Sequence, residues 1–116
     1  MSDMLCEETL NELVEQVGAE LVATLLVDLA DDAGGRVANM QNLLAANDMD
    51  ELRKEAHTLK SSTGTLGLTL LSEQAAIIER KLVTGEGPEV APIVPELTKL
   101  LEDGLAAANI WIADKV

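Results

Sequence analysis

The sequence has almost no aromatic residues: Trp111 is the single tryptophan, and tyrosine and phenylalanine are absent. Modules that bind single-stranded nucleic acids stack bases on exposed aromatic rings, so this class of protein is disfavoured. Basic residues are also few, with 8 Lys and Arg against 21 Asp and Glu and a net charge of −13. Because such a chain repels phosphate backbones and anionic lipids, we expect no nucleic-acid partner and no membrane partner.

Histidine and cysteine each occur once, as His57 and Cys6. A zinc site or a disulfide framework needs several such residues, so we expect no metal site and no cofactor. No apolar run reaches the roughly 18 residues that suggest a membrane span. The first ten residues carry acidic side chains where a signal peptide carries positive charge, so we expect a cytoplasmic protein.

The 116 residues present, 47% of them hydrophobic, are enough for one domain that spans residues 1–116. Apolar residues recur at helical spacing along the chain, and no alternating strand pattern is found. Short connections make consecutive helices antiparallel neighbours. The sequence therefore predicts an all-α fold, an antiparallel up-down helical bundle.

A short helix is predicted near the N-terminus. Thr9 and Glu12 match a capping box, and Gly18 is a natural helix end. A start nearer Ser2 is the alternative.

A much longer apolar stripe follows at residues 21–44 and crosses Gly34-Gly35. Each glycine costs about 1 kcal/mol in a helix interior, which would suit two helices. The stripe keeps its register through the glycines, however, so we predict one long helix that is weakened at its centre.

Three more helices are predicted in the remaining chain. Asp48 or Asp50 caps the third helix, which ends at Gly67, and Thr69 caps the fourth. Three prolines within residues 88–95 then interrupt helical structure. The last helix is therefore expected to begin near Pro95.

His57 is predicted to lie on the outer face of the third helix. At about 100° per residue, the apolar positions of this helix converge on one direction, and His57 points roughly 140° away from it. Arg53, Lys60, Ser61 and Gly64 share its side of the helix. We expect Lys60 and Ser61, one turn further on, to be its nearest neighbours.

This setting suits an imidazole that carries a phosphoryl group. The Nε2 atom of His57 is a nucleophile when Nδ1 holds the proton, and Lys60 with Arg53 supplies positive charge nearby. Hydrolase chemistry would need an oxyanion hole, which a flat helix face does not offer. A metal site would need a second His or a Cys at position 61, where this chain has Ser. No nucleotide-binding glycine motif is present, so we expect no ATP-dependent kinase activity.

The run Ala56 to Leu68, AHTLKSSTGTLGL, resembles the signature of histidine phosphotransfer (HPt) domains, which reads approximately A-H-x-L-K-G-S-x-x-x-L-G. The histidine, leucine, lysine and final Leu-Gly pair fall in register. The main departure is Ser61, where the family most often has glycine. In length and helix order, the resemblance spans essentially the whole chain.

The resemblance implies an antiparallel up-down four-helix bundle with an additional short N-terminal lid helix. It implies that His57 is the phosphoacceptor, that Lys60 is its electrostatic partner, and that Gly64 fills a small position under the ring. Glu79 matches a position where the family has Gln or Glu, which hydrogen-bonds the ring. A carboxylate there would fix the tautomer that leaves Nε2 free.

The implied partners are response-regulator receiver domains, which would hold the Mg²⁺, and a hybrid sensor kinase. The chain would accept a phosphoryl group from a receiver aspartate on His57 and pass it to another regulator's aspartate. It would be a phosphocarrier rather than a complete enzyme, and we expect a monomer. Candidate docking residues are the apolar positions of the first helix and the start of the second: Leu10, Val14, Val17, Leu21 and Leu25.

Other interpretations remain open at this point. One alternative is the phosphoacceptor domain of a chemotaxis-type histidine kinase, which the chain also resembles in having Glu rather than Gln at position 79. A non-catalytic helical adaptor that binds receiver domains is the third interpretation. Five of the eight basic residues form either a positive rim around His57 or ordinary solvated helix faces: Arg53, Lys54, Lys60, Arg80 and Lys81.

Overall fold

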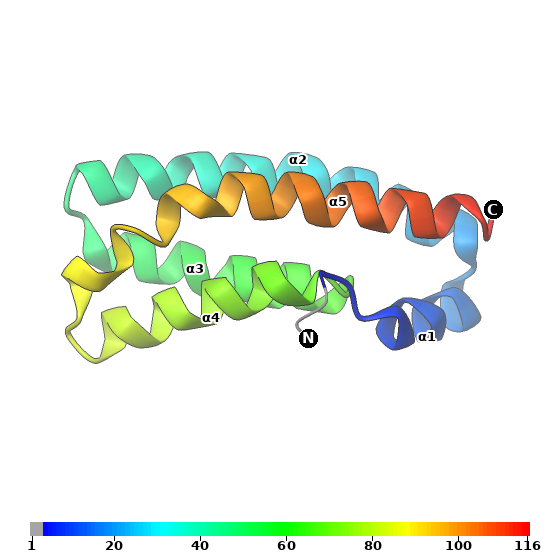
Figure 1. Cartoon of the computed structure of the whole chain (residues 1–116), viewed down its shortest axis with the longest axis horizontal. Coiled ribbons are helices and arrows are strands. Elements are labelled where there is room, and N and C mark those ends of the chain that lie inside the picture. Colours follow the sequence, from blue (N-terminus) through cyan, green and yellow to red (C-terminus); the bar gives the residue numbers. More distant parts are fainter. Residues whose placement is uncertain (1–3) are drawn as a thin grey trace.

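Four long helices run side by side in the computed structural model, which describes residues 4–116 (Figure 1). They are α2 (Ala19–Ala45), α3 (Met49–Thr65), α4 (Thr69–Val83) and α5 (Leu97–Ala113). Consecutive helices run in opposite directions, with α2 beside α5 and α3 beside α4. The described residues contain no strand, so the predicted all-α up-down bundle is confirmed.

The short helix α1 (Glu7–Val17) packs against α2 and extends the bundle at one end (Figure 1). The predicted capping box is wrong, because α1 begins two residues before Thr9 and Met4 to Cys6 are not helical. A start near Ser2 would lie outside the described residues. The backbone N–H of Cys6 donates to the carbonyl of Gly67 at 2.8 Å, so a tertiary contact sets where α1 begins. Thr9 instead donates its hydroxyl hydrogen bond to Cys6 Sγ.

The predicted single long helix is confirmed, since α2 continues through Gly34-Gly35 without a break. Added Cβ atoms at these two glycines would meet no atom within 4 Å. The glycines are therefore not required for close packing. The apolar stripe on the buried face is what holds the helix together across them.

The turns on either side of α3 differ from one another. Asp48 caps the helix, since its carboxylate accepts from the backbone N–H of Glu51, so the first of the two predicted caps is the right one. At the other end, Gly67 takes a positive φ of 76°. The predicted Thr69 cap is wrong: Leu68 is the N-cap of α4, and Thr69 donates its hydroxyl to the carbonyl of Gly67.

The proline-rich connection forms two short 3₁₀ helices, η1 (Gly87–Val90) and η2 (Val94–Glu96), before α5 begins at Leu97. This agrees with the predicted helix start near Pro95. Both 3₁₀ helices place a proline in their first turn, where its missing N–H is tolerated.

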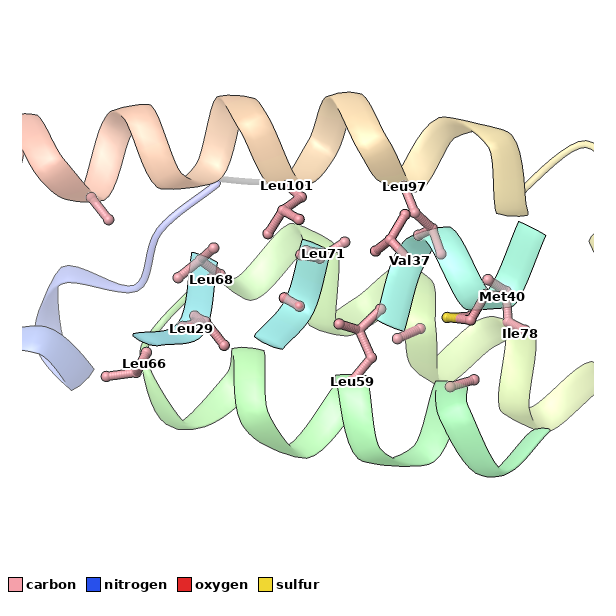
Figure 2. Packing of buried hydrophobic residues seen from close by; sticks show 14 of the residues in the cluster. Leu29, Val37, Met40, Leu59, Leu66, Leu68, Leu71, Ile78, Leu97 and Leu101 are labelled. Carbon is pink, nitrogen blue, oxygen red and sulfur yellow. The ribbon is translucent and has the colours of Figure 1, made fainter. Parts of the chain in front are cut away.

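The core is aliphatic, as the lack of aromatic residues requires (Figure 2). Leucines from all four long helices meet there with Met40, and a single polar side chain, Thr63, is buried among the described residues. The Thr63 hydroxyl donates to the carbonyl of Leu59 at 2.7 Å and thus costs little to bury. Packing on this inner face leaves the outer faces of α3 and α4 free to carry polar side chains.

Candidate functional site

His57 lies on the solvent side of α3, with 58% of its side chain exposed, as the helical periodicity predicts. Its Nδ1 atom lies 2.6 Å from Oε2 of Glu79 on the facing helix α4. The Glu79 side chain is only 18% exposed, so this carboxylate sits between the helices while the ring projects outward. One ring nitrogen is therefore engaged by the protein.

The charge of Glu79 determines which ring nitrogen carries the proton. The hydrogen bond from the Lys60 ammonium lowers the pKa of Glu79, partial burial opposes this, and the His57 contact lowers it further. The carboxyl is thus ionised at neutral pH and has no proton to donate. Since a carboxylate only accepts, the neutral imidazole must place its proton on Nδ1, which leaves the Nε2 lone pair unprotonated.

Lys60 lies one turn after His57, and its Nζ donates to Oε1 of Glu79 at 2.7 Å. The two oxygens of one carboxylate therefore serve two side chains of α3, the ring of His57 and the ammonium of Lys60. The Lys60 side chain is 35% exposed, so its charge is partly open to solvent. An anion placed on the outer side of the ring would find this positive charge nearby.

Three of the other four predicted cations pair with carboxylates away from His57, whereas Arg80 makes no side-chain ion pair within residues 4–116. Arg53 donates to Asp50 on its own helix at 3.3 Å, and no hydrogen bond or ion pair joins it to His57 in the described part of the chain. Lys54 pairs with Glu51 at 3.2 Å. Further along, Lys81 pairs with Glu89 from η1 at 3.0 Å. With these carboxylate partners, the basic cluster is largely a set of ion-paired, solvated helix faces rather than a rim of free charge.

The small residues near His57 occupy two different environments. Ser61 is exposed and follows the ring by one helical turn. Gly64 instead faces α4, where an added Cβ would lie 3.0 Å from the hydroxyl oxygen of Ser72. The structure thus brings Gly64 against Ser72, a contact that the sequence pattern did not reveal.

An open groove lies between α2 and α3, with a volume of about 320 Å³. Its lining combines apolar and polar side chains from both helices: Leu25, Asp28, Leu29, Asp32, Ser62, Thr65 and Leu66. At about 1.5 Å of rise per residue, Ser62 and Thr65 lie roughly 8–12 Å along α3 from His57. Among the expected docking residues, Leu25 lines this groove, whereas Leu10 is fully buried and has no surface to offer a partner. Val17 and Leu21 are 44% and 46% exposed.

Residues 4–116 hold neither a cluster of metal-binding side chains nor a membrane-spanning helix. No group of three or more metal-binding side chains comes together in this part of the chain. No helix within it combines the length and apolar character needed to cross a membrane.

A family model described as the Hpt domain matches residues 5–108. The chain belongs to the Hpt domain family. It is thereby a histidine phosphotransfer protein of the kind used in two-component phosphorelays.

Two relatives of this Hpt domain span its length. The phosphorelay protein LuxU of Vibrio harveyi is 24% identical over 110 residues, which cover 95% of this chain and 96% of that protein. The crystal structure of the histidine-containing phosphotransfer protein HptB from Pseudomonas aeruginosa PAO1 superposes with a TM-score of 0.76. It shares 24% identity and covers 98% of this chain and 95% of that one, which shows that the two have the same fold.

Proposed function

We propose that His57 of this Hpt domain is the phosphoacceptor and that its Nε2 atom is the nucleophile. The observation that carries the proposal is the 2.6 Å contact between Nδ1 and the Glu79 carboxylate. This contact holds the proton on Nδ1 and presents Nε2 from an exposed ring. Lys60 is the cation that offsets the charge of the incoming phosphoryl group, because it lies one turn from His57 and its side chain is 35% exposed.

In the proposed step, the Nε2 lone pair attacks the phosphorus of a phosphorylated aspartate on a receiver domain. The N–P bond forms as the P–O bond to the aspartate breaks, and the aspartate leaves as a carboxylate. The proton stays on Nδ1, held by Glu79. The reverse step returns the phosphoryl group to the aspartate of another response regulator. This chain supplies the nucleophile, and the receiver supplies the Mg²⁺.

The groove between α2 and α3 is the proposed docking surface for the receiver domain. Its apolar floor includes Leu25 and Leu29, and it lies within about two helical turns of His57. Asp28 and Asp32 on its lining give it negative charge, which favours a partner surface with positive charge at its edge. A receiver seated there would cover the outer face of α3 and meet the exposed ring.

We further propose that residues 1–116 act as one carrier domain, a monomer in the cytoplasm, that takes phosphate from a hybrid sensor kinase. The alternative is that the same residues act as the phosphoacceptor domain of a chemotaxis-type kinase. A non-catalytic adaptor role is less well supported, since His57, Lys60 and Glu79 form a connected hydrogen-bonded set.

The experiment is incubation of the chain with a receiver domain whose aspartate carries radiolabelled phosphate. The wild-type chain is expected to take up label that is lost in acid and survives alkali, as a phosphohistidine does. The variant His57→Gln is expected to take up none. Equal labelling of the two proteins would overturn the proposal.

A matched control separates loss of chemistry from loss of binding. Both proteins are titrated against the unphosphorylated receiver, because His57→Gln keeps the groove residues intact. Similar affinities with different labelling support His57 as the acceptor. Loss of binding in His57→Gln would instead be a failure to dock, and the labelling result would then have to be repeated at saturating receiver.

A further inference from the structure

Ser72 of α4 and Gly64 of α3 face one another beside Lys60, one of the three residues of the proposed phosphoacceptor site. The Ser72 hydroxyl donates to the backbone carbonyl of Lys60 at 2.9 Å. The missing side chain of Gly64 makes room for that hydroxyl, since an added Cβ would lie 3.0 Å from Ser72 Oγ. A hydroxyl of α4 thus bonds directly to the backbone of α3 at the residue whose ammonium faces Glu79.

The position of Ser72 on α4 connects this contact to Glu79. The two residues are seven apart, or about two turns, so they lie on the same face of the helix. This one face of α4 therefore contacts Lys60 twice. Ser72 binds the backbone carbonyl of Lys60, and Glu79 binds the ammonium at 2.7 Å and the ring of His57 at 2.6 Å.

The geometry points to Ser72 and Gly64 as positioning residues for the phosphoacceptor. They fix how closely α4 approaches α3, and at which height along it, so that one carboxylate reaches both His57 and Lys60. Neither residue touches the reacting atoms. This inference rests on the proposed function of His57, and it adds a pair of residues that acts through Glu79.

The narrow space between Gly64 and Ser72 makes the pair testable. At Gly64, an added Cβ would lie 3.0 Å from Ser72 Oγ but 3.8 Å from Ser72 Cβ, which is an ordinary contact. Gly64→Ala is therefore expected to push α4 outward. Removing the hydroxyl with Ser72→Ala should relieve that pressure, so the double variant should behave like Ser72→Ala alone.

The primary measurement is the ¹⁵N NMR spectrum of the His57 ring in the unphosphorylated protein, which reports the Nδ1–H tautomer and its hydrogen bond. The second is the transfer rate from a phosphorylated receiver. Gly64→Ala should weaken the Nδ1 hydrogen bond and slow transfer about tenfold. Ser72→Ala should have a smaller effect on the Nδ1 hydrogen bond and on the transfer rate. The double variant should match Ser72→Ala in both measurements.

Asn39→Ala is the matched control, because it removes a hydrogen bond of 2.8 Å between α2 and Glu55 of α3, on the other side of that helix. It should leave the ring spectrum unchanged. Equal effects of Asn39→Ala and Gly64→Ala, or a double variant as impaired as Gly64→Ala, would overturn the inference. If Gly64→Ala fails to fold, an unchanged ring spectrum in Ser72→Ala overturns it.

The ring spectrum also separates this inference from the proposed function. It is recorded without phosphate, so it reports the positioning of Glu79 whether or not His57 accepts a phosphoryl group. Failure of the proposed function would appear in the labelling experiment instead, where the variant His57→Gln would take up phosphate like the wild-type chain.

Discussion

Nδ1 of His57 and Oε2 of Glu79 lie 2.6 Å apart across the interface between α3 and α4, although 22 positions separate the residues in the chain. The same carboxylate accepts a hydrogen bond from Lys60 through its other oxygen. A partly buried anion thus orients an exposed ring and holds its proton. The proposed nucleophile therefore stands on an open helix face rather than in an enclosed active site.

Replacing Glu79 should slow phosphotransfer while the bundle stays folded. Glu79→Ala removes the acceptor of both hydrogen bonds, and the loss of a charged hydrogen bond corresponds to about tenfold or more in rate. Glu79→Gln keeps an oxygen for Nδ1 but loses the charge, so its rate should fall between the wild type and Glu79→Ala. The measurement is the single-turnover transfer rate, with circular dichroism to check folding. Identical rates in all three proteins would remove Glu79 from the mechanism.

The Glu79 interactions should be lost in acid. The folded protein lowers the pKa of Glu79, so its contribution is complete above the ordinary value of 4.5 and disappears as the pH falls through the folded pKa. Lys60→Gln removes the largest cause of the lowering. We expect NMR titration of the Glu79 carboxyl to show a higher midpoint in Lys60→Gln than in the wild type. A midpoint that stays the same or moves lower would contradict the assigned role of Lys60.

Glycines in this chain should respond to substitution in opposite directions. Gly34 lies in the interior of α2 with open space around it, so Gly34→Ala should stabilise the fold by about 1 kcal/mol. Gly67 has a φ of 76°, and an added Cβ would lie 3.0 Å from the carbonyl oxygen of Cys6. Gly67→Ala should therefore destabilise the fold by about 1–3 kcal/mol. Urea unfolding measures both, and effects of the same sign would contradict the account of α2 and of the turn.

The groove between α2 and α3 should govern receiver binding. Leu25→Glu places a charge on its apolar floor and is expected to weaken receiver affinity about tenfold. Val27→Glu is the matched control, because Val27 is 68% exposed on the same helix and does not line the groove. Titration of a receiver domain by calorimetry measures both variants. If both variants weaken receiver affinity equally, the docking surface lies elsewhere or the effect comes only from the added negative charge.

Much of the bundle follows from helical periodicity alone. The unbroken apolar register across Gly34-Gly35 predicts one long α2, and the outward direction of His57 predicts its exposure. The helix caps predicted at Thr9 and Thr69 are wrong, because α1 is capped by Cys6 and α4 by Leu68. The Cys6–Gly67 hydrogen bond instead fixes the start of α1.

The candidate site likewise has features that the sequence predicts and features that depend on tertiary packing. His57 and Lys60 share a local motif, and family resemblance points to Glu79. The partner of Arg53 and the contact between Gly64 and Ser72 depend on side-chain rotamers and on the spacing of two helices. Neither is encoded in the period of one helix, so the sequence pattern alone did not reveal them.

The central claim is that Glu79 holds the proton on Nδ1 so that Nε2 accepts the phosphoryl group. The most direct test is NMR of ¹⁵N-labelled chain after phosphorylation by a receiver domain, read from the coupling between phosphorus and the ring nitrogens of His57. The account predicts coupling to Nε2 and an Nδ1 that remains protonated. Coupling to Nδ1, or phosphate on any residue other than His57, would contradict it.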